Sequence, residues 1–114
     1  YTMAVDRGNA QVAPLYTPYH PAVLRSIRSV IAAAKSAGIP VGMCGEAAAD
    51  PRLTPLLLHW GLDEFSVSAA SVLSTRAQIS SWHSREAARV EEEAMKLSTA
   101  AGVQGYLEAS SKSV

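Results

Sequence analysis

Hydrophobic and polar positions alternate along the chain in a pattern that predicts helices and strands in turn. Residues 10–16 are short and mixed, and Pro14 and Pro18 limit them to one or two helical turns. A longer helix follows, with Pro21 near its first position and Gly38 just past its end. Apolar residues at helical spacing define its expected packed face, namely Val23, Ile27, Val30, Ile31 and Ala34.

Two apolar runs are too short for helices and predict strands. Residues 39–43 follow the capping glycine and predict a buried strand, in which Pro40 is tolerated only at the start. Residues 62–69 predict a second strand, with Phe65 and Val67 on one face. Because helical segments alternate with these runs, the pattern indicates parallel pairing and an α/β fold.

Further helices are predicted between and after the strands. Asp50 is the expected cap and Pro51 the first turn of a helix that stops at Gly61. Another covers about residues 71–82, and a last one opens at Ser84. The packed sides are expected to be Leu53, Leu56, Leu57 and Trp60 in the first, Val72, Ile79 and Trp82 in the second, and Ala87, Val90, Ala94 and Leu97 in the third.

Charged residues cluster on the helix that is predicted to open at Ser84. The triplet at residues 91–93 is interpreted as a solvated helix face, and Glu92–Lys96 and Arg89–Glu93 are expected ion pairs one turn apart. After Gly102 the sequence is expected to decay into a frayed tail, Ser110–Ser111–Lys112–Ser113–Val114.

Composition narrows the class of protein. The 114 residues are 48% hydrophobic, which predicts one modest folded core rather than a disordered tail. Ten basic and ten acidic residues give a net charge of zero, so nothing attracts nucleic acid or anionic lipid broadly. No apolar run approaches the roughly 18 residues of a membrane span, and no signal peptide is recognisable. The single Cys44 cannot form an internal disulfide, which favours a reducing, cytoplasmic location.

The start of the chain and its strand count suggest a piece of a longer protein. Residue 1 is not methionine, and a polar turn at residues 6–9 has no element before it. Two parallel strands leave unpaired N–H and C=O groups on both outer edges and do not form a stable sheet alone. A cleaved terminus explains the missing methionine equally well.

Cys44 is the first candidate for chemistry. It directly follows the first predicted strand, and active sites of α/β proteins assemble at the carboxyl ends of strands. The structural alternative, a buried cysteine acting as a small hydrophobe, is the commoner role. A nucleophile would need a histidine base, but His20, His59 and His83 all lie on predicted helices. A metal site would need more than one soft ligand. Proton donation is the role that requires the fewest neighbouring groups, because a single protonated thiol can perform it.

Arg7 is the second candidate, in a polar turn beside a glycine. A guanidinium there suits bidentate binding of phosphate or carboxylate, although an exposed pair with Asp6 is the plainer interpretation. Carboxylates near the strand ends are candidates of lower rank: Glu46, Asp50, Asp63 and Glu64.

Several motifs resemble the enzyme I family of the bacterial phosphoenolpyruvate:sugar phosphotransferase system. They are Tyr-Thr-Met-Ala-Val-Asp-Arg-Gly-Asn at residues 1–9, Leu-Tyr at 15–16, Gly-Met-Cys-Gly-Glu at 42–46 and Leu-Asp-Glu-Phe-Ser-Val-Ser-Ala at 62–69. The likeness runs to about residue 79 and weakens from residue 84. Phosphoenolpyruvate synthase and pyruvate phosphate dikinase share the cysteine loop, but their counterpart of residues 6–9 usually reads differently.

The resemblance implies a fold and a set of roles. Residues 1–114 would be the C-terminal portion of a (β/α)8 TIM barrel, an incomplete barrel with the last two strands and flanking helices. Cys44 would be the proton donor, and Arg7 would contact the substrate phosphate. The phosphorylated histidine, two further arginines, an Asn–Asp pair and the Mg²⁺ ligand would precede residue 1. Ala49 replaces a family glycine, and would strain the loop by about 1 kcal/mol if a positive φ is needed there.

The implied activity is phosphoryl transfer from phosphoenolpyruvate to an enzyme histidine and then to a histidine-containing phosphocarrier protein for sugar uptake, with release of pyruvate. The resemblance also implies a cytoplasmic homodimer with no nucleic acid and no membrane insertion. These 114 residues alone are expected to be inactive. A different class of function is a non-catalytic half-barrel that self-associates through its open strand edges.

Overall fold

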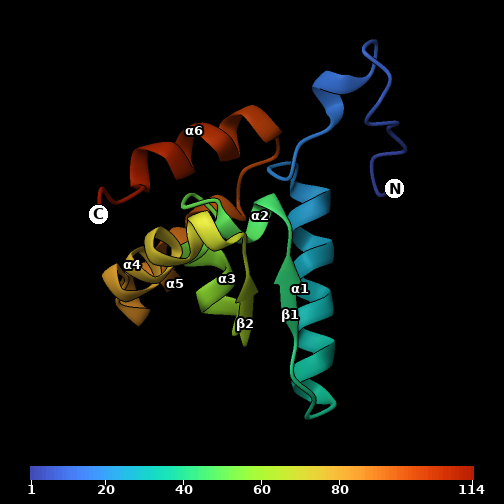
Figure 1. Cartoon of the computed structure of the whole chain (residues 1–114). Coiled ribbons are helices and arrows are strands. Elements are labelled where there is room, and N and C mark those ends of the chain that lie inside the picture. Colours follow the sequence, from blue (N-terminus) through green and yellow to red (C-terminus); the bar gives the residue numbers. More distant parts are fainter.

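The computed structural model, which describes all of residues 1–114, contains a small parallel sheet of two strands. Strand β1 (Gly42–Cys44) pairs with β2 (Glu64–Ser66) in the register Gly42–Glu64, Met43–Phe65 and Cys44–Ser66. The helices are α1 (Pro21–Ser36), α2 (Glu46–Ala49), α3 (Thr54–Trp60), α4 (Val72–Ser81), α5 (Ser84–Ala94) and α6 (Ala100–Ser110), with 3₁₀ turns at Ala13–Leu15 and Ala69–Ser71 (Figure 1). The α/β class and the parallel pairing are confirmed, and two strands do not close a barrel.

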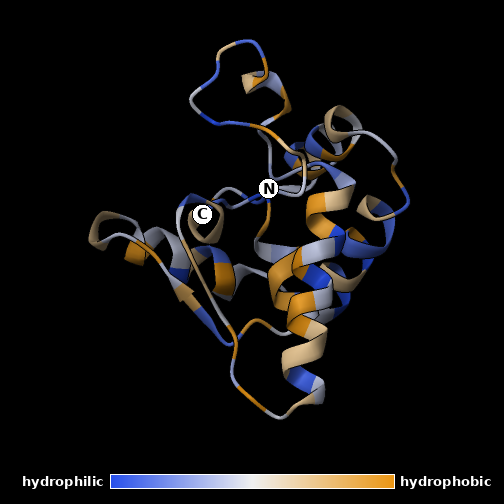
Figure 2. Ribbon diagram, turned by 90° about the vertical axis from the view of Figure 1, so that its right-hand side faces the viewer, coloured by the Kyte–Doolittle hydropathy of each residue, from blue (hydrophilic) through white to orange (hydrophobic).

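Helix α1 begins and ends as the sequence predicts. The His20 Nδ1 atom accepts the backbone N–H of Ala22 at 3.1 Å, and Gly38 follows the last turn with a φ of 68°. The packed face is only partly as predicted, because Leu24 is buried and Val30 is 62% exposed. Hydrophobic positions recur along α1, which runs beside β1 in Figure 1 and faces the viewer in Figure 2, but the core covers only one side of it.

The strands are shorter and more exposed than predicted. Each contains three residues, and in each only the middle residue is half-buried, Met43 in β1 and Phe65 in β2. The prediction of a buried strand over residues 39–43 is therefore wrong, and Ile39 is exposed. The physical reason is the sheet's width: with two strands, each has one neighbour and one open edge.

The core is formed by helices. The largest part lies where α3 packs against α5 and α1, and α6 closes it by packing on α5. The cluster comprises Tyr19, Leu24, Ile31, Leu53, Leu56, Leu57, Leu62, Val90, Ala94, Val103 and Leu107. The predicted faces of α3 and α5 are confirmed for their leucines, alanines and valine, whereas Trp60 and Leu97 are only half-buried.

Helix α6 occupies most of the stretch after Gly102, for which the sequence predicts no element, and residues 111–114 follow it without helix or strand. The Thr99 side chain caps it by accepting the N–H of Gly102 at 3.0 Å. Val103 and Leu107, one turn apart, are buried on one face of the helix. Lys112, within the predicted tail, contacts the folded part of the chain. Its ammonium donates to the Ser81 carbonyl at 2.7 Å and lies 4.5 Å from the centre of the Trp82 ring.

The acidic triplet at residues 91–93 is not wholly a solvated face. Glu91 is 12% exposed and accepts the Trp60 indole N–H at 3.0 Å. Of the expected surface pairs, Glu92–Lys96 is present at 3.9 Å, while Arg89 forms no ion pair. No helix combines the length and the apolar character needed to cross a membrane.

Candidate functional site

A hollow of about 530 Å³ opens at the carboxyl end of β1. One wall is made by the N-terminal segment and residues 16–18, and the other by residues 44–47. Figure 1 shows how this forms, since the N-terminal segment lies beyond the start of α1, at the end toward which β1 runs. Arg7, Cys44 and Glu46 all line this hollow, so the two residues singled out from the sequence share one site.

Cys44 reaches the hollow because of the local backbone. It is the last residue of β1, and Gly45 follows with a φ of 95°, a conformation that residues with a side chain rarely adopt. That turn redirects the chain into α2 immediately after Cys44. The thiol is exposed, so Cys44 does not act as a small hydrophobe in the core.

Arg7 is held by a turn rather than by an ion pair. Asp6 Oδ1 accepts the backbone N–H of Gly8 at 2.9 Å, and the Asp6 carbonyl accepts the N–H of Asn9 at 3.1 Å. Arg7 forms no salt bridge with Asp6 or with any other residue. Its guanidinium is exposed and available to a ligand in the hollow.

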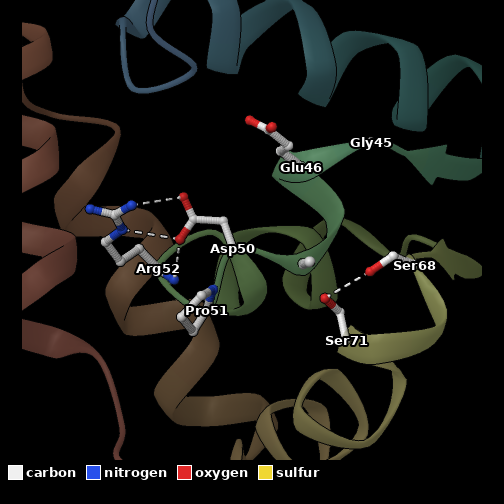
Figure 3. A pocket seen from close by; sticks show the side chains of 8 residues that line it. Gly45, Glu46, Asp50, Pro51, Arg52, Ser68 and Ser71 are labelled. Atoms are coloured by element: carbon white, nitrogen blue, oxygen red, sulfur yellow. Dashed lines mark hydrogen bonds and ion pairs between the residues drawn. The ribbon is translucent and has the colours of Figure 1, made fainter.

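A second hollow of about 540 Å³ lies along α2, between the loop after β1 and the loop after β2 (Figure 3). Ser68 and Ser71 line one side, where the two hydroxyls are 3.1 Å apart. Glu46, Asp50 and Arg52 line the other side. Gly45 and Glu46 border both hollows, so α2 separates them.

Asp50 is more than the helix cap predicted from the sequence. It does accept the backbone N–H of Arg52 at 3.0 Å, but α3 begins only at Thr54. The carboxylate also accepts the Arg52 Nε–H at 3.0 Å and the Tyr19 hydroxyl, and Figure 3 shows the Arg52 contacts. Burial, followed by the hydrogen bond to Asp50, raises the pKa of Tyr19 above its ordinary value. The phenol is therefore protonated at neutral pH and donates.

Tyr19 and Arg52 were not recognisable as site residues from the sequence. Tyr19 lies 31 positions before Asp50, and Arg52 donates through Nη1 to Glu108, 56 positions later. No local spacing rule links residues at such separations. Of these contacts, only the one between Asp50 and Arg52 joins residues that are close in the sequence.

The remaining candidates have structural roles away from the hollow. Asp63 accepts from Lys35 at 2.8 Å and from the Val41 N–H at 2.9 Å, which joins the end of α1 to the strand region. The three histidines lie on or beside helices, and His83 forms a capping box with Glu86 at the start of α5. Ala49 lies within α2 and does not have a positive φ, so the expected strain is absent.

Metal ligands do not gather anywhere in this chain. No group of three or more histidine, cysteine, aspartate or glutamate side chains is placed to hold one metal ion. The residues present therefore do not fit a Mg²⁺ site.

The chain matches a known protein family. The family described as PEP-utilising enzyme, PEP-binding domain, matches residues 1–84. The chain belongs to this family. The matched range contains Arg7, Cys44 and both strands.

Relatives named phosphoenolpyruvate-protein phosphotransferase match most of the chain. The protein of Geobacillus stearothermophilus is 53% identical over 107 residues, which are 94% of this chain and 18% of the relative. That of Bacillus subtilis is 50% identical over 107 residues, or 94% of this chain and 19% of the relative. That of Lactococcus lactis is 58% identical over 77 residues, which are 68% of this chain and 13% of the relative.

The matches confirm the resemblance to enzyme I. The family match ends at residue 84, where the likeness is expected to weaken, and the matches over 107 residues also take in most of the region of α5 and α6. The chain spans less than a fifth of the length of these relatives, between 13% and 19%.

Proposed function

We propose that this chain is the C-terminal portion of the phosphoenolpyruvate-binding (β/α)8 barrel of a phosphoenolpyruvate-protein phosphotransferase. The proposed reaction moves the phosphoryl group of phosphoenolpyruvate to an enzyme histidine and on to a histidine-containing phosphocarrier protein, and releases pyruvate. The observation that carries it is that Arg7 and Cys44 line one hollow at the carboxyl end of β1. The printed names of the relatives support the reaction class.

Arg7 has the chemistry to hold the substrate phosphate. A guanidinium can donate two parallel hydrogen bonds to phosphate oxygens, and such charge-assisted contacts are about twice as strong as neutral ones. Because Arg7 has no protein anion as a partner, binding phosphate would not require breaking an existing ion pair. Its charge would also stabilise the negative charge on the transferring group.

Cys44 is proposed as the proton donor. When the P–O bond breaks, the phosphoryl group goes to the histidine and the enolate of pyruvate remains. The Cys44 thiol gives its proton to the methylene carbon of that enolate, which yields pyruvate and a thiolate, and the thiolate regains a proton from water. This role requires the protonated thiol, the opposite of what a nucleophilic cysteine requires.

The remaining parts of the proposed protein lie outside these residues. The phosphorylated histidine and the Mg²⁺ ligands are proposed to belong to other segments of the full protein. We also propose a cytoplasmic homodimer, in line with the family resemblance. The zero net charge gives no support to a nucleic-acid-binding role, and no helix is long and apolar enough to cross a membrane.

The test is the substitution Cys44→Ala in a full-length phosphotransferase that contains this segment. Phosphohistidine is expected to form from phosphoenolpyruvate, because that step needs no proton at carbon. Pyruvate formation is expected to slow by about 10²–10⁴-fold, the usual effect of losing a general acid. Cys44→Ser is expected to be nearly as slow, because a hydroxyl is a far weaker acid than a thiol. Retained stereospecific proton incorporation at the pyruvate methyl in Cys44→Ala would remove Cys44 from this role.

One structural observation favours a second candidate function, self-association without catalysis. Each strand of the sheet has an edge with no neighbour. Sedimentation of the purified chain at tens of micromolar tests this, since association would double the mass and a compact monomer would exclude it.

A further inference from the structure

The four side chains Tyr19, Asp50, Arg52 and Glu108 form one connected cluster, which we call the Asp50 cluster. Tyr19 is 5% exposed, and the Asp50 side chain is 13% exposed. Arg52 joins them by bonding Asp50 through Nε at 3.0 Å and through Nη2 at 3.3 Å. Its third nitrogen donates to Glu108 on α6 at 3.0 Å, and its guanidinium lies 4.9 Å from the centre of the Tyr19 ring.

The Asp50 cluster lies behind the walls of the hollow that contains Cys44. Tyr19 directly follows residues 16–18, which line one wall. Asp50 directly follows α2, whose first residues line the other wall next to Cys44. The hydrogen bond from the Tyr19 hydroxyl to Asp50 therefore ties the two walls together.

The short loop between Cys44 and Asp50 transmits this restraint. α2 spans only Glu46–Ala49, and Ala48 is fully buried, so this helix cannot shift without disturbing the core. Between Cys44 and α2 stands only Gly45, in the left-handed region of φ. α2 is held at its middle by Ala48 and at its end by Asp50. Gly45 is therefore the one residue between Cys44 and α2 whose backbone can still change conformation.

We propose that Tyr19, Asp50 and Arg52 position the Cys44 thiol by clamping the two walls of its hollow together. This rests on the function proposed above, in which Cys44 donates a proton to the enolate. Tyr19 and Asp50 are positioning residues, because neither lines the hollow itself. The bond from Arg52 to Glu108 extends the clamp to α6, beyond the residues that match the PEP-binding domain.

The test is Tyr19→Phe in a full-length phosphotransferase that contains this segment. The change removes one hydroxyl and keeps the ring beneath Arg52, so the fold is expected to remain. Pyruvate formation is expected to slow on the order of 10- to 100-fold, the effect of misplacing a reacting group by about 1 Å. Stereospecific proton incorporation at the pyruvate methyl is expected to decline, while the KM for phosphoenolpyruvate changes less than about threefold and phosphohistidine still forms.

Tyr106→Phe is the matched control. Tyr106 is half-buried against the core on α6, and its hydroxyl has no hydrogen-bond partner among the residues described. The Tyr106→Phe variant is expected to match the wild type in phosphohistidine formation, pyruvate formation and stereospecific proton incorporation. Asp50→Asn, which weakens the bonds to both Tyr19 and Arg52, is expected to show the Tyr19→Phe pattern more strongly.

The outcomes separate this proposal from the one on which it rests. Wild-type protonation rate and stereospecificity in Tyr19→Phe and Asp50→Asn, with both lost in Cys44→Ala, would overturn the clamp and leave the proton donor in place. Intact stereospecificity in Cys44→Ala would overturn the proposed function first. An equal fall of phosphohistidine and pyruvate formation in Tyr19→Phe, with a lowered melting temperature, would show a purely structural role and would also overturn the clamp.

Discussion

Two regions of the molecule differ sharply in how they are held. The helical half, which we define as α3, α5, α6 and their adjoining residues, contains most of the closed core. The sheet side, defined as residues 1–18 with β1 and β2, contains no buried residue. Large apolar side chains such as Leu15 and Tyr16 are exposed there.

The residues that stabilise the fold and the residues proposed for chemistry lie in different regions. The helical half buries apolar surface among its own helices, so it supplies most of the hydrophobic stabilisation. The sheet side presents open strand edges, an exposed thiol and an unpaired guanidinium, which suit contact with a ligand or with further chain. Substitutions in the helical half should therefore change stability, and those in the sheet side should change activity.

The largest expected effect on stability is that of Leu56→Ala in the helical half. Leu56 is fully buried, and deleting its side chain leaves a cavity, so the free energy of unfolding should fall by about 2–5 kcal/mol. Urea denaturation of the chain followed by circular dichroism measures this. The matched control is Val30→Ala, on the exposed side of α1, which should change stability by less than about 0.5 kcal/mol. Similar losses in the two variants would contradict the comparison.

Arg7→Ala tests the sheet side. In a full-length phosphotransferase containing this segment, it should lower kcat/KM for phosphoenolpyruvate by about 10²–10³-fold, the usual effect of removing one donor to a developing charge. Arg7→Lys should restore little, because an ammonium does not reproduce the two-pronged contact of the guanidinium. The melting temperature should not change, since Arg7 makes no ion pair. Wild-type kinetics in Arg7→Lys would remove Arg7 from the site.

Glu91→Ala tests the junction between the helical half and α1. Glu91 on α5 accepts from the Trp60 indole on α3 at 3.0 Å and lies 3.4 Å from the Arg28 guanidinium on α1. Removing this half-buried acceptor leaves the indole N–H without a partner, so the free energy of unfolding should fall by about 1–3 kcal/mol. Glu92→Ala, at an exposed neighbouring position, is the control and should be nearly neutral. The same denaturation experiment measures both.

The smallest expected effect is the response to acid, and it compares a carboxylate next to the sheet with one in the helical half. The Lys35 ammonium lowers the pKa of Asp63, next to β2, below its ordinary 3.8, and the Lys112 ammonium lowers that of Glu86 on α5 below its ordinary 4.5. Each ionised group stabilises the fold above its ordinary pKa, and this contribution disappears as the pH falls through the lowered value. The urea midpoint should therefore decline between about pH 5 and pH 3.

Asp63→Asn and Glu86→Gln should each flatten this decline while lowering the midpoint at neutral pH. The Asp63 side chain is 40% exposed and that of Glu86 is 45% exposed, so solvent screens both ion pairs and each change should be small. An unchanged acid slope in both variants would show that neither ion pair contributes to stability.

Sequence patterns predicted α3 and α5 well, and predicted α6 and the sheet side poorly. The leucines of α3 and the alanines of α5 recur at helical spacing, and that spacing alone identifies the side that packs. Residues 39–43 were predicted to be buried because they are apolar, but burial depends on neighbouring strands that the local pattern does not reveal. Helix α6 was missed because serines and glycines near it suggested a tail, although Thr99 and the Val103–Leu107 spacing were usable signals.

The candidate site divides in the same way. Cys44 and Arg7 were found from local context, a strand end and a polar turn, together with the family resemblance. That they line one hollow could not be derived, because the path of residues 1–18 over the strand end depends on tertiary packing. The Asp50 cluster was missed for the same reason, since its outer members are separated from Asp50 by dozens of residues.

The positions of the two tryptophans have a consequence for spectroscopy. Trp60 ends α3 and Trp82 lies just before α5, under the Lys112 ammonium, so both report on the helical half. Intrinsic fluorescence excited at the indole band is therefore blind to the hollow, where Tyr1 and Tyr16 are the aromatic residues. An indole introduced by Tyr16→Trp would emit from the wall of the hollow. Coincident fluorescence transitions from the two places would show that the molecule unfolds as one unit, and an earlier transition of the introduced indole would show that the hollow opens while the helices stay folded.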